Sequence, residues 1–399
     1  MIPADSAAAS QEQEFSLYVH VPFCSIRCGY CDFNTYATED FGQGVGLATY
    51  ANDAIAELDF AQQVLKRSGV PERTMNTVFF GGGTPTKLPS ADLVRILHHA
   101  IELFGLSPDA EVTTEANPDS VLEKDLSVLA AGGFTRVSIG MQSVVPEVLS
   151  VLERTHTPEN VPKVVSWASQ EELQTSVDLI YGSPGETLEQ WRRSVEAAIS
   201  YEPDHISAYS LIVEDGTKLA AQIRRGKYHM PDEDLMADMY LLAEELLTEA
   251  GYHWYEVSNY AKAPQYRSTH NYSYWRNQDW WGIGPGAHSH IAGTRWWNVK
   301  HPVTYAHRLR QGDSPAAARE ILDHKTQFFE KVMLELRTVD GIPYEVLANI
   351  HGTETLDRKL RWLQNQGLID DEQLKRGVVG LTLQGRLLGD AVTRELLPE

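Results

Sequence analysis

Cysteine is scarce in this chain: its 399 residues include only three, Cys24, Cys28 and Cys31, all within one eight-residue segment. An odd number of cysteines crowded into one place excludes the disulfide framework of a small secreted protein. The same crowding is typical of a set of thiolate ligands kept in a reducing compartment. We therefore expect these residues to bind an inorganic centre in a cytoplasmic protein.

Long hydrophobic runs and a surplus of positive charge are also lacking. No stretch approaches the roughly 18 apolar residues that span a bilayer. The first residues show neither the basic nor the apolar segment of a signal peptide. The formal net charge is −21, whereas a nucleic-acid-binding protein needs a basic surface to displace counterions. We expect no membrane span, no signal peptide and no nucleic-acid partner.

What is present is a regular alternation of short strand-like segments and longer helical ones. Strands are predicted at 17–21, 77–82, 111–117, 136–142, 176–182 and 205–213, and helices at 49–67, 90–105, 187–201 and 232–250. This order predicts an α/β fold built on a parallel sheet. Polar and glycine-rich loops follow the strands, and loops at the carboxyl ends of parallel strands meet in one site.

The composition divides the chain into four parts. Residues 1–14 are small and polar, and we expect them to be disordered. Residues 15–260 carry the alternation, and residues 261–319 are rich in tryptophan, tyrosine, histidine and glycine. We expect a core barrel and a segment that closes it. Residues 320–399 predict a small α-rich, winged-helix-like domain, with a hairpin and then a helix over 378–396.

The three cysteines have the spacing C-x3-C-x2-C and follow the first predicted strand. A cluster of four irons and four sulfides (4Fe–4S) normally takes four cysteine ligands. Three ligands leave one iron open to bind a substrate or cofactor, because the chain has no fourth cysteine. The alternative is a zinc ion with His20 as its fourth ligand, although structural zinc more often uses two separated ligand pairs.

This spacing, followed by Gly81-Gly82-Gly83-Thr84-Pro85 after the second predicted strand, resembles the radical S-adenosylmethionine (SAM) superfamily. The segments YVHVPFCSIRCGYCDF, FFGGGTPT, TTEANPDS, VSIGMQS, VDLIYGSPGET and HNYSYW are similar to the branch of oxygen-independent coproporphyrinogen III oxidase and the haem chaperones related to it. The resemblance implies a partial (β/α)6 barrel. It also implies one 4Fe–4S cluster, ligated by the three cysteines, whose open iron binds the amino and carboxylate groups of SAM.

The resemblance also implies how SAM is held. Its cationic amino group needs acceptors, and Gly82, Gly83 and Thr84 can bring backbone carbonyl groups close because glycine has no side chain. Glu115 would accept hydrogen bonds from the ribose hydroxyls, and Arg154 would contact SAM from the segment after the fourth strand. For the glycines the alternative is a plain strand-to-helix turn, and for Arg154 it is an exposed position on a surface helix.

Four further candidates are polar or aromatic: Tyr18, Tyr30, Gln142 and Asp178. Gln142 and Asp178 lie, like Glu115, on otherwise apolar strands, where a buried polar group costs free energy unless it is paired. A bound ligand would pair all three, and internal hydrogen bonds are the alternative. Tyr18 lies where the porphyrin branch has a SAM-contacting tyrosine, and the ring of Tyr30 would pack near the adenine. Both tyrosines have core packing as the alternative.

Three features separate the oxidase from the chaperones. The oxidase of this family has a longer segment before its cluster and the pattern C-x3-C-x2-C-x-C, where this chain has 23 residues and Phe33. The segment His270-Asn271-Tyr272-Ser273-Tyr274-Trp275 matches the HNxxYW signature of the chaperones. All three features favour a chaperone that binds haem and passes it to an acceptor, such as a respiratory protein. The oxidase, which decarboxylates propionates with a 5′-deoxyadenosyl radical, is the alternative.

A haem site needs an apolar or aromatic face and often a histidine ligand. His270, His288 and His290 lie within 21 residues, among tyrosines and tryptophans. We expect His270 to belong to a haem site, with aromatic core packing as the alternative, whereas His288 could face the SAM site. No catalytic residue is assigned, and we expect haem binding without coproporphyrinogen oxidase activity.

Overall fold

Six parallel strands form the centre of the computed structural model, which describes residues 2–398. They are β1 (Phe15–Val21), β2 (Met75–Gly82), β3 (Leu106–Ala116), β4 (Arg136–Gln142), β5 (Gln174–Tyr181) and β6 (His205–Ser210), and they lie side by side in chain order. Most of their residues are buried, as expected for parallel strands that are covered on both faces. The predicted α/β fold with a parallel sheet is confirmed.

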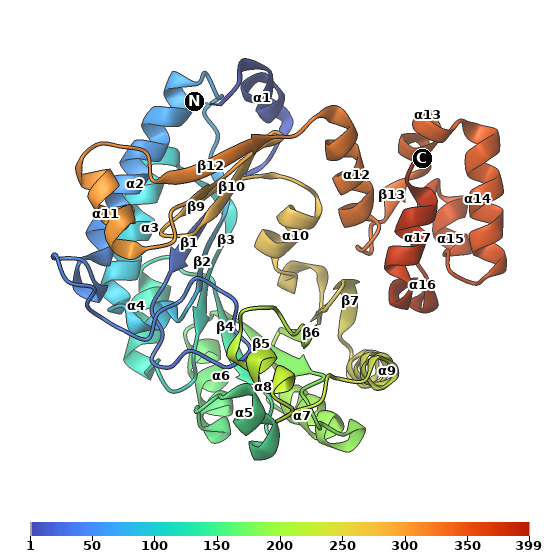
Figure 1. Ribbon diagram of the computed structural model, residues 1–399, viewed down its shortest axis with the longest axis horizontal. Helices are drawn as coiled ribbons and strands as arrows, with labels where there is room; N and C mark the ends of the chain where they lie inside the picture. Colours follow the sequence, from blue (N-terminus) through green and yellow to red (C-terminus); the bar gives the residue numbers. More distant parts are fainter. Residues whose placement is uncertain (1, 399) are drawn as a thin grey trace.

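Helices connect the strands and cover the outer face of the sheet (Figure 1). They are α2 (Leu47–Arg67), α3 (Ser90–Phe104), α4 (Glu123–Ala131), α5 (Pro146–Leu152), α6 (Val161–Gln170) and α7 (Leu188–Ser200). α3 shows why they pack there: its buried residues Leu93, Ile96, Leu97 and Ala100 share one helical face. Because each crossover returns to the same end of the sheet, the carboxyl ends of all six strands share one edge.

The sheet continues beyond both ends of the parallel series. The added strands are β7 (His253–Glu256) and β8 (Asn259–Ala261) beside β6, and β9 (Asp279–Ile283), β10 (His288–Ile291), β11 (Thr294–Asn298) and β12 (Ala316–Ile321) beside β1. Residues 261–319 were expected to close a barrel. They lengthen the sheet instead, because β9 pairs with β1 and the strand order ends at β12 and β7.

Four helices belong to these later segments: α8 (Lys218–Arg224), α9 (Glu233–Glu249), α10 (Thr269–Trp275) and α11 (Pro302–Arg310). α10 lies against β2 on the inner side of the curved sheet (Figure 1). Its N-terminal backbone amides are held by Glu111, whose carboxylate accepts from the Thr269 amide at 2.7 Å. Within residues 2–398, no helix is both long enough and apolar enough to cross a membrane.

The N-terminal segment differs from the expectation that residues 1–14 are disordered. Helix α1 (Ala4–Ala9) and the 3-10 turn η1 (Ser10–Glu12) follow the start of the described chain. Alanine favours helix formation, and tertiary contacts hold the segment in place. The Ser6 hydroxyl is 3.0 Å from that of Thr294, and Arg73 donates to the carbonyl of Ser10 at 2.6 Å. These partners lie far along the chain, so composition alone did not reveal them.

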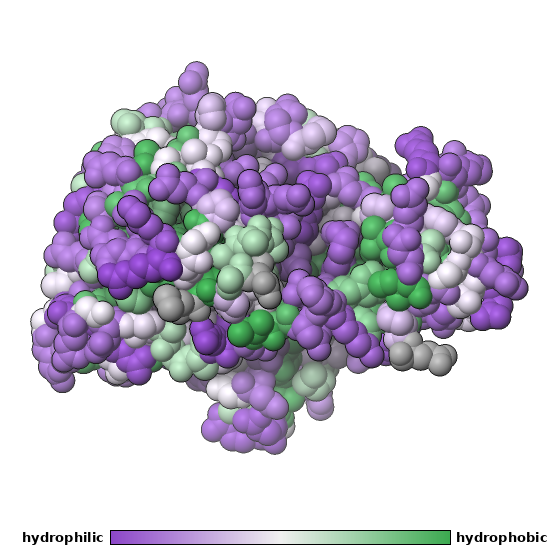
Figure 2. All heavy atoms as spheres, turned by 90° about the horizontal axis from the view of Figure 1, so that it is seen from above, coloured by the Kyte–Doolittle hydropathy of each residue, from purple (hydrophilic) through white to green (hydrophobic). Residues whose placement is uncertain are grey.

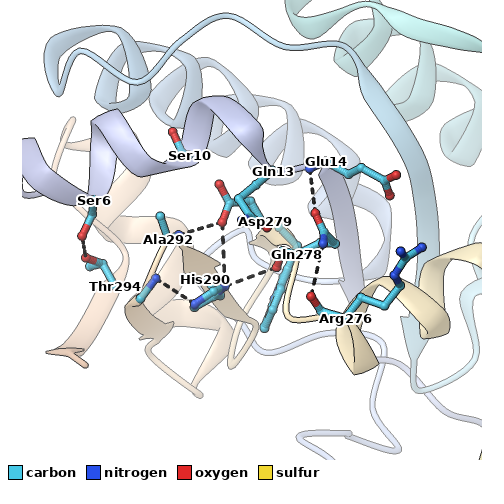
Figure 3. A network of polar contacts seen from close by, with 12 residues as sticks. Ser6, Ser10, Gln13, Glu14, Arg276, Gln278, Asp279, His290, Ala292 and Thr294 are labelled. Carbon is cyan, nitrogen blue, oxygen red and sulfur yellow. Dashed lines mark hydrogen bonds and ion pairs between the residues drawn. The ribbon is translucent and has the colours of Figure 1, made fainter. Parts of the chain in front are cut away.

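A buried carboxylate ties this segment to the extended sheet (Figure 3). Asp279, fully buried at the start of β9, accepts from the Arg73 guanidinium at 2.8 Å and from the Ala292 amide at 2.7 Å. Its own amide donates to the Glu14 carbonyl, and the Glu14 amide donates to the Gln278 side chain. The network therefore links residues that enter β1, β9 and the turn after β10.

The C-terminal domain has a hydrophobic core of its own. It contains α12 (His324–Glu335), α13 (Tyr344–His351), α14 (Thr353–Asn365), α15 (Asp371–Lys375), α16 (Leu383–Leu387) and α17 (Gly389–Leu396), with strands β13 (Ile342–Pro343) and β14 (Val378–Val379). The local hairpin predicted over 378–396 is wrong: β14 pairs with β13, and Thr382 caps α16. The domain contacts the large domain through Arg386, which binds the Glu244 carboxylate with two nitrogens at 2.8 and 2.9 Å.

Candidate metal and cofactor site

A cavity of about 420 Å³ opens where the central strands end. All three cysteines line it, together with nearly every residue that the sequence suggested for the cofactor. Those lining residues are Cys24, Cys28, Cys31, Tyr30, Gly82, Gly83, Thr84, Glu115, Gln142, Arg154 and Asp178. Residues from distant parts of the chain thus meet at one edge of the sheet, as the rule for parallel strands predicts.

The three cysteine sulfurs each lie near a polar side chain. Arg154 Nη1 is 3.7 Å from Cys28 Sγ, Thr84 Oγ1 is 4.0 Å from Cys24 Sγ, and Cys31 Sγ is 3.9 Å from the Thr35 hydroxyl. Donors of this kind stabilise sulfur that carries negative charge. The cavity is therefore chemically suited to three thiolates bound to a positively charged inorganic centre.

The zinc alternative with His20 finds no support in this geometry. The His20 ring nitrogens lie 3.0 Å from the Tyr18 hydroxyl and 3.0 Å from the Asn34 carbonyl oxygen, so both have protein partners. Across residues 2–398, no three Cys, His, Asp or Glu side chains are placed to hold a single metal ion. Sulfurs spread around one cavity suit a centre larger than one ion, such as a 4Fe–4S cluster.

The glycine loop after β2 leaves no room for side chains. A Cβ atom on Gly83 would lie 2.6 Å from the Phe23 carbonyl oxygen and 3.0 Å from Cys24 Sγ. Gly82 has φ of 106°, which L-residues rarely adopt. Both features exceed what a plain strand-to-helix turn requires. They keep the backbone of the loop close to the cysteine segment, where it can contact a ligand directly.

Two carboxyl groups lie together in the wall of the cavity. Burial, and then the charge of Asp178, raises the pKa of Glu115 to about 8, although the Gly82 amide donates to Glu115 at 3.0 Å. Burial also raises the pKa of Asp178, and the Ser138 hydroxyl, which donates at 2.7 Å, opposes that rise. Asp178 thus has an internal hydrogen-bond partner, which was the alternative to pairing by a bound ligand. Glu115 keeps an oxygen for which no partner is found among residues 2–398.

Replacing Glu115 with glutamine should stabilise the ligand-free protein at alkaline pH and weaken SAM binding. The folded protein holds the Glu115 proton up to about pH 8, whereas the unfolded chain loses it near pH 4.5. Protonated Glu115 therefore contributes its full stabilisation of the folded state at acidic pH. This contribution is lost as the pH rises through both pKa values. Melting temperatures of the two proteins should diverge between pH 5 and about 8.

Above about pH 8, where Glu115 is charged, the same variant should lose about 1.5–3 kcal/mol of SAM affinity, the worth of a hydrogen bond to a charged group. Isothermal titration of the cluster-loaded protein measures this loss. If the variant and the unchanged chain have equal melting temperatures at pH 8 and equal SAM affinities, Glu115 neither has the raised pKa nor contacts the ligand.

Gln142 and Arg154 carry buried polar atoms without a protein partner. Arg154 donates to the Gly140 carbonyl at 2.7 Å and lines the cavity. The alternative, an exposed arginine on a surface helix, therefore does not apply. Its Nε atom and the Oε1 atom of Gln142 have no hydrogen-bond partner within residues 2–398. Gln142 also adopts φ of 63°. Strained backbone and unpaired buried atoms are typical of a site that a ligand completes.

A second cavity of about 290 Å³ lies deeper in the sheet's concave side and shares Gly82, Glu115 and Asp178 with the first. Tyr18 lines this inner cavity rather than the one with the cysteines, and its hydroxyl contacts His20. Tyr18 is therefore placed beside Glu115, one layer behind the proposed cofactor.

His270 also lines the inner cavity, but its ring is fully engaged. Nδ1 lies 2.7 Å from the Thr77 hydroxyl and Nε2 lies 2.8 Å from the Tyr274 hydroxyl. The ring is 1% exposed and stacks on Phe79, and burial lowers its pKa to about 3. Neither nitrogen is free to bind iron in this arrangement, which matches the alternative of aromatic core packing.

The other two histidines do not reach the cofactor cavities. His288 is exposed on β10 and stacks on Trp297, so it lines neither cavity. His290 contacts the Gln278 carbonyl and accepts from the Gly293 amide. Both side chains are tied to the extension of the sheet.

Sequence reasoning missed several residues that line the cavity. Ser138 precedes Gly140 and Gln142 by two and four positions on β4 and lines the cavity with them. Strand periodicity offered that signal, because alternate residues share a face. Tyr209, near the end of β6, and Phe33 line both cavities. Phe33 lies in an irregular loop, and the sequence marked it only as the residue in place of the oxidase's further cysteine, not as part of the cavity wall.

Comparisons with known proteins agree with this geometry. A family model described as the radical SAM superfamily matches residues 18–198. The chain is similar to the heme chaperone HemW of Mycobacterium tuberculosis, at 44% identity over 96% of this chain and 95% of that protein. It is also similar to the heme chaperone HemW of Bacillus subtilis, at 33% identity over 96% of this chain and 99% of that one.

A solved structure shares the whole architecture. Coproporphyrinogen III oxidase (HemN) from Escherichia coli, described as a radical SAM enzyme, has a TM-score of 0.81 and covers 99% of this chain and 92% of its own. Its sequence identity is 22%, so this likeness establishes the fold alone.

Proposed function

Because this chain belongs to the HemW family of the radical SAM superfamily, we propose that it binds haem and passes it to an acceptor protein, on a scaffold that holds a 4Fe–4S cluster and SAM. One observation carries the proposal. The three thiols and the predicted SAM residues line one cavity, in a chain that resembles haem chaperones along nearly its full length.

Cys24, Cys28 and Cys31 would be the cluster's only protein ligands. The bound cluster would supply an open iron for the amino and carboxylate groups of SAM. The chain's own residues prepare that position. Arg154 donates toward Cys28 Sγ, and Gly83 lets the loop after β2 approach Cys24. The cysteines must stay reduced to bind iron, which favours a cytoplasmic location.

The remaining lining residues would hold SAM. Glu115 and Asp178 would meet its ribose hydroxyls, and Gln142 and Arg154 would use atoms that have no partner among the described residues. Gly82, Gly83 and Thr84 would contact the amino group, Tyr30 the adenine, and Tyr18 would support the site from the inner cavity. A ligand in this position would complete the hydrogen bonds of the buried polar groups.

We further propose that the protein does not oxidise coproporphyrinogen. Phe33 stands where the oxidase pattern has a further cysteine, and it lines both the cofactor cavity and the inner cavity. That arrangement puts an apolar side chain at the place where the two cavities meet.

A haem titration tests the function. Ferric haem added to the cluster-loaded protein should saturate near one per chain, followed by its Soret absorption. In a parallel assay, the same protein with SAM and a reductant should not convert coproporphyrinogen III to protoporphyrinogen IX. Failure to bind haem would overturn the chaperone function, and multiple turnovers of coproporphyrinogen III would replace it with the oxidase.

A further inference from the structure

A groove of about 590 Å³ lies between the large domain and the C-terminal domain. α9 and the strand β7 form its wall on one side, and α16 and the start of α17 form the other (Figure 1). Its volume is within the range of about 300–1,000 Å³ that is typical of small-molecule sites. None of the residues assigned above to the cluster or to SAM lines it.

Both walls of the groove present apolar side chains to solvent. Val257 on one side is 38% exposed, and Leu387 and Leu388 on the other are 39% and 47% exposed. Figure 2 shows hydrophobic side chains gathered on the C-terminal domain and beside it, within a largely hydrophilic surface. Apolar surface left facing apolar surface across a gap favours a ligand that fills the gap.

Aromatic residues add a flat, partly polar surface. Tyr240 and Trp254 line the groove on the large-domain side. The indole nitrogen of Trp254 is buried and has no partner among residues 2–398. Of the side chains lining the groove, Met236, Tyr181 and Tyr240 are of types that coordinate haem iron.

The groove is basic in a chain whose net charge is −21. Three arginines and one acid line it. Arg386 binds Glu244 and lies 4.2 Å above the Trp254 ring, and Arg337 pairs with Asp390. Arg394 is exposed and has no partner within the described part of the chain. A free guanidinium beside an apolar groove selects a ligand that carries a carboxylate.

The inner cavity of the large domain fits such a ligand less well. Its volume is about 290 Å³, against about 590 Å³ for the groove, and its wall carries two acids, Glu115 and Asp178, and one arginine, Arg136. The ring nitrogens of His270 there already have protein partners. The smaller volume and the engaged His270 ring point away from that cavity as the haem site.

We propose that haem binds in the groove between the two domains. Its macrocycle lies between the apolar walls, and a propionate pairs with Arg394. This inference rests on the proposed haem function and adds to it the location of the site. It also gives the C-terminal domain a role, since that domain supplies one wall and the free arginine.

Two variants and two matched controls test the site in the full, cluster-loaded chain. Arg394→Glu and Leu388→Glu should each weaken ferric haem binding at least about tenfold, the loss expected for a charge-assisted hydrogen bond or a buried apolar contact. Arg361→Glu, at an exposed arginine of α14, and Ile350→Glu, at an exposed apolar residue of α13, lie outside the groove lining. They should bind haem as the unchanged chain does. Full cluster content, together with unchanged far-ultraviolet circular dichroism and an unchanged melting temperature, shows that both domains are folded in all four variants.

Protoporphyrin IX and its dimethyl ester separate charge from shape. The ester lacks free carboxylates, so Arg394→Glu should weaken binding of the free acid and leave ester binding unchanged. Leu388→Glu should weaken both.

Each outcome decides one question. If the unchanged chain binds no haem, the proposed function fails, and this inference fails with it. If the unchanged chain binds haem and both groove variants bind it equally well, the function stands and the groove is not the site. Loss of haem in His270→Ala, with normal binding by both groove variants, would place haem inside the large domain.

Discussion

Replacing Cys28 with alanine should leave the purified protein without an iron–sulfur cluster, with iron and sulfide at background after anaerobic reconstitution. Cys24, Cys28 and Cys31 are the only cysteines in the chain, so no other thiol can take the lost position. Two thiolates would hold the cluster at two irons only, whereas such clusters normally have four cysteine ligands. SAM affinity should fall as well, because its amino and carboxylate groups would lose the iron they bind.

Iron and sulfide assays, together with the visible spectrum, measure this loss. Ser25→Ala is a matched control in the same loop: Ser25 is exposed, and its hydroxyl accepts from Lys87 at 3.4 Å. The control should keep a full cluster. Cys24→Ala and Cys31→Ala should behave as Cys28→Ala does, and an intact cluster in any of the three would contradict ligation by these residues.

Replacing Asp279 with alanine should destabilise the large domain by about 3 kcal/mol, the lower end of the loss expected when one partner of a buried ion pair is removed. Asp279 is fully buried, and its partner Arg73 has a side chain that is 12% exposed. The change also leaves the Ala292 amide without its acceptor. Arg73 keeps its bonds to the carbonyls of Ser10 and Gln13, which limits the loss.

Urea unfolding, followed by far-ultraviolet circular dichroism, measures the free energy of unfolding. Asp92→Ala is the control, because Asp92 forms an ion pair with Arg95 whose side chains are 25% and 48% exposed. Exposed pairs contribute at most about 1 kcal/mol. A loss in Asp279→Ala no larger than in Asp92→Ala would mean that the network in Figure 3 does not support the fold.

The central sheet and the gathering of the site residues were predictable from local patterns. The strand from Arg136 to Gln142 has the bounds that the sequence predicted. The order of the strands then predicted that Glu115, Gln142 and Asp178 lie at the same edge of the sheet, and no side-chain contact had to be known for that. Such inferences succeed because they depend on the short-range period of a strand and on one general rule of parallel folds.

Other features depended on partners far away in the chain. His270 is held by Thr77, which lies 193 positions earlier, and no local pattern reports that bond. The same holds for the pairing of β9 with β1, which keeps the sheet open. In the C-terminal domain, Val378 and Val379 have the composition of a strand, but their partner strand is β13 rather than the residues that follow.

The open sheet has an edge strand, and this strand affects whether molecules associate at high protein concentration. β12 is the last strand of the order, and all but its first residue are exposed. Such an edge offers backbone groups with which a strand of another molecule can pair. Arg319 and Glu320 place charge on that edge, and a net charge of −21 makes each copy repel the next. The acidity of the chain therefore has a physical use besides solubility in water: it opposes aggregation through the edge that the fold leaves uncovered.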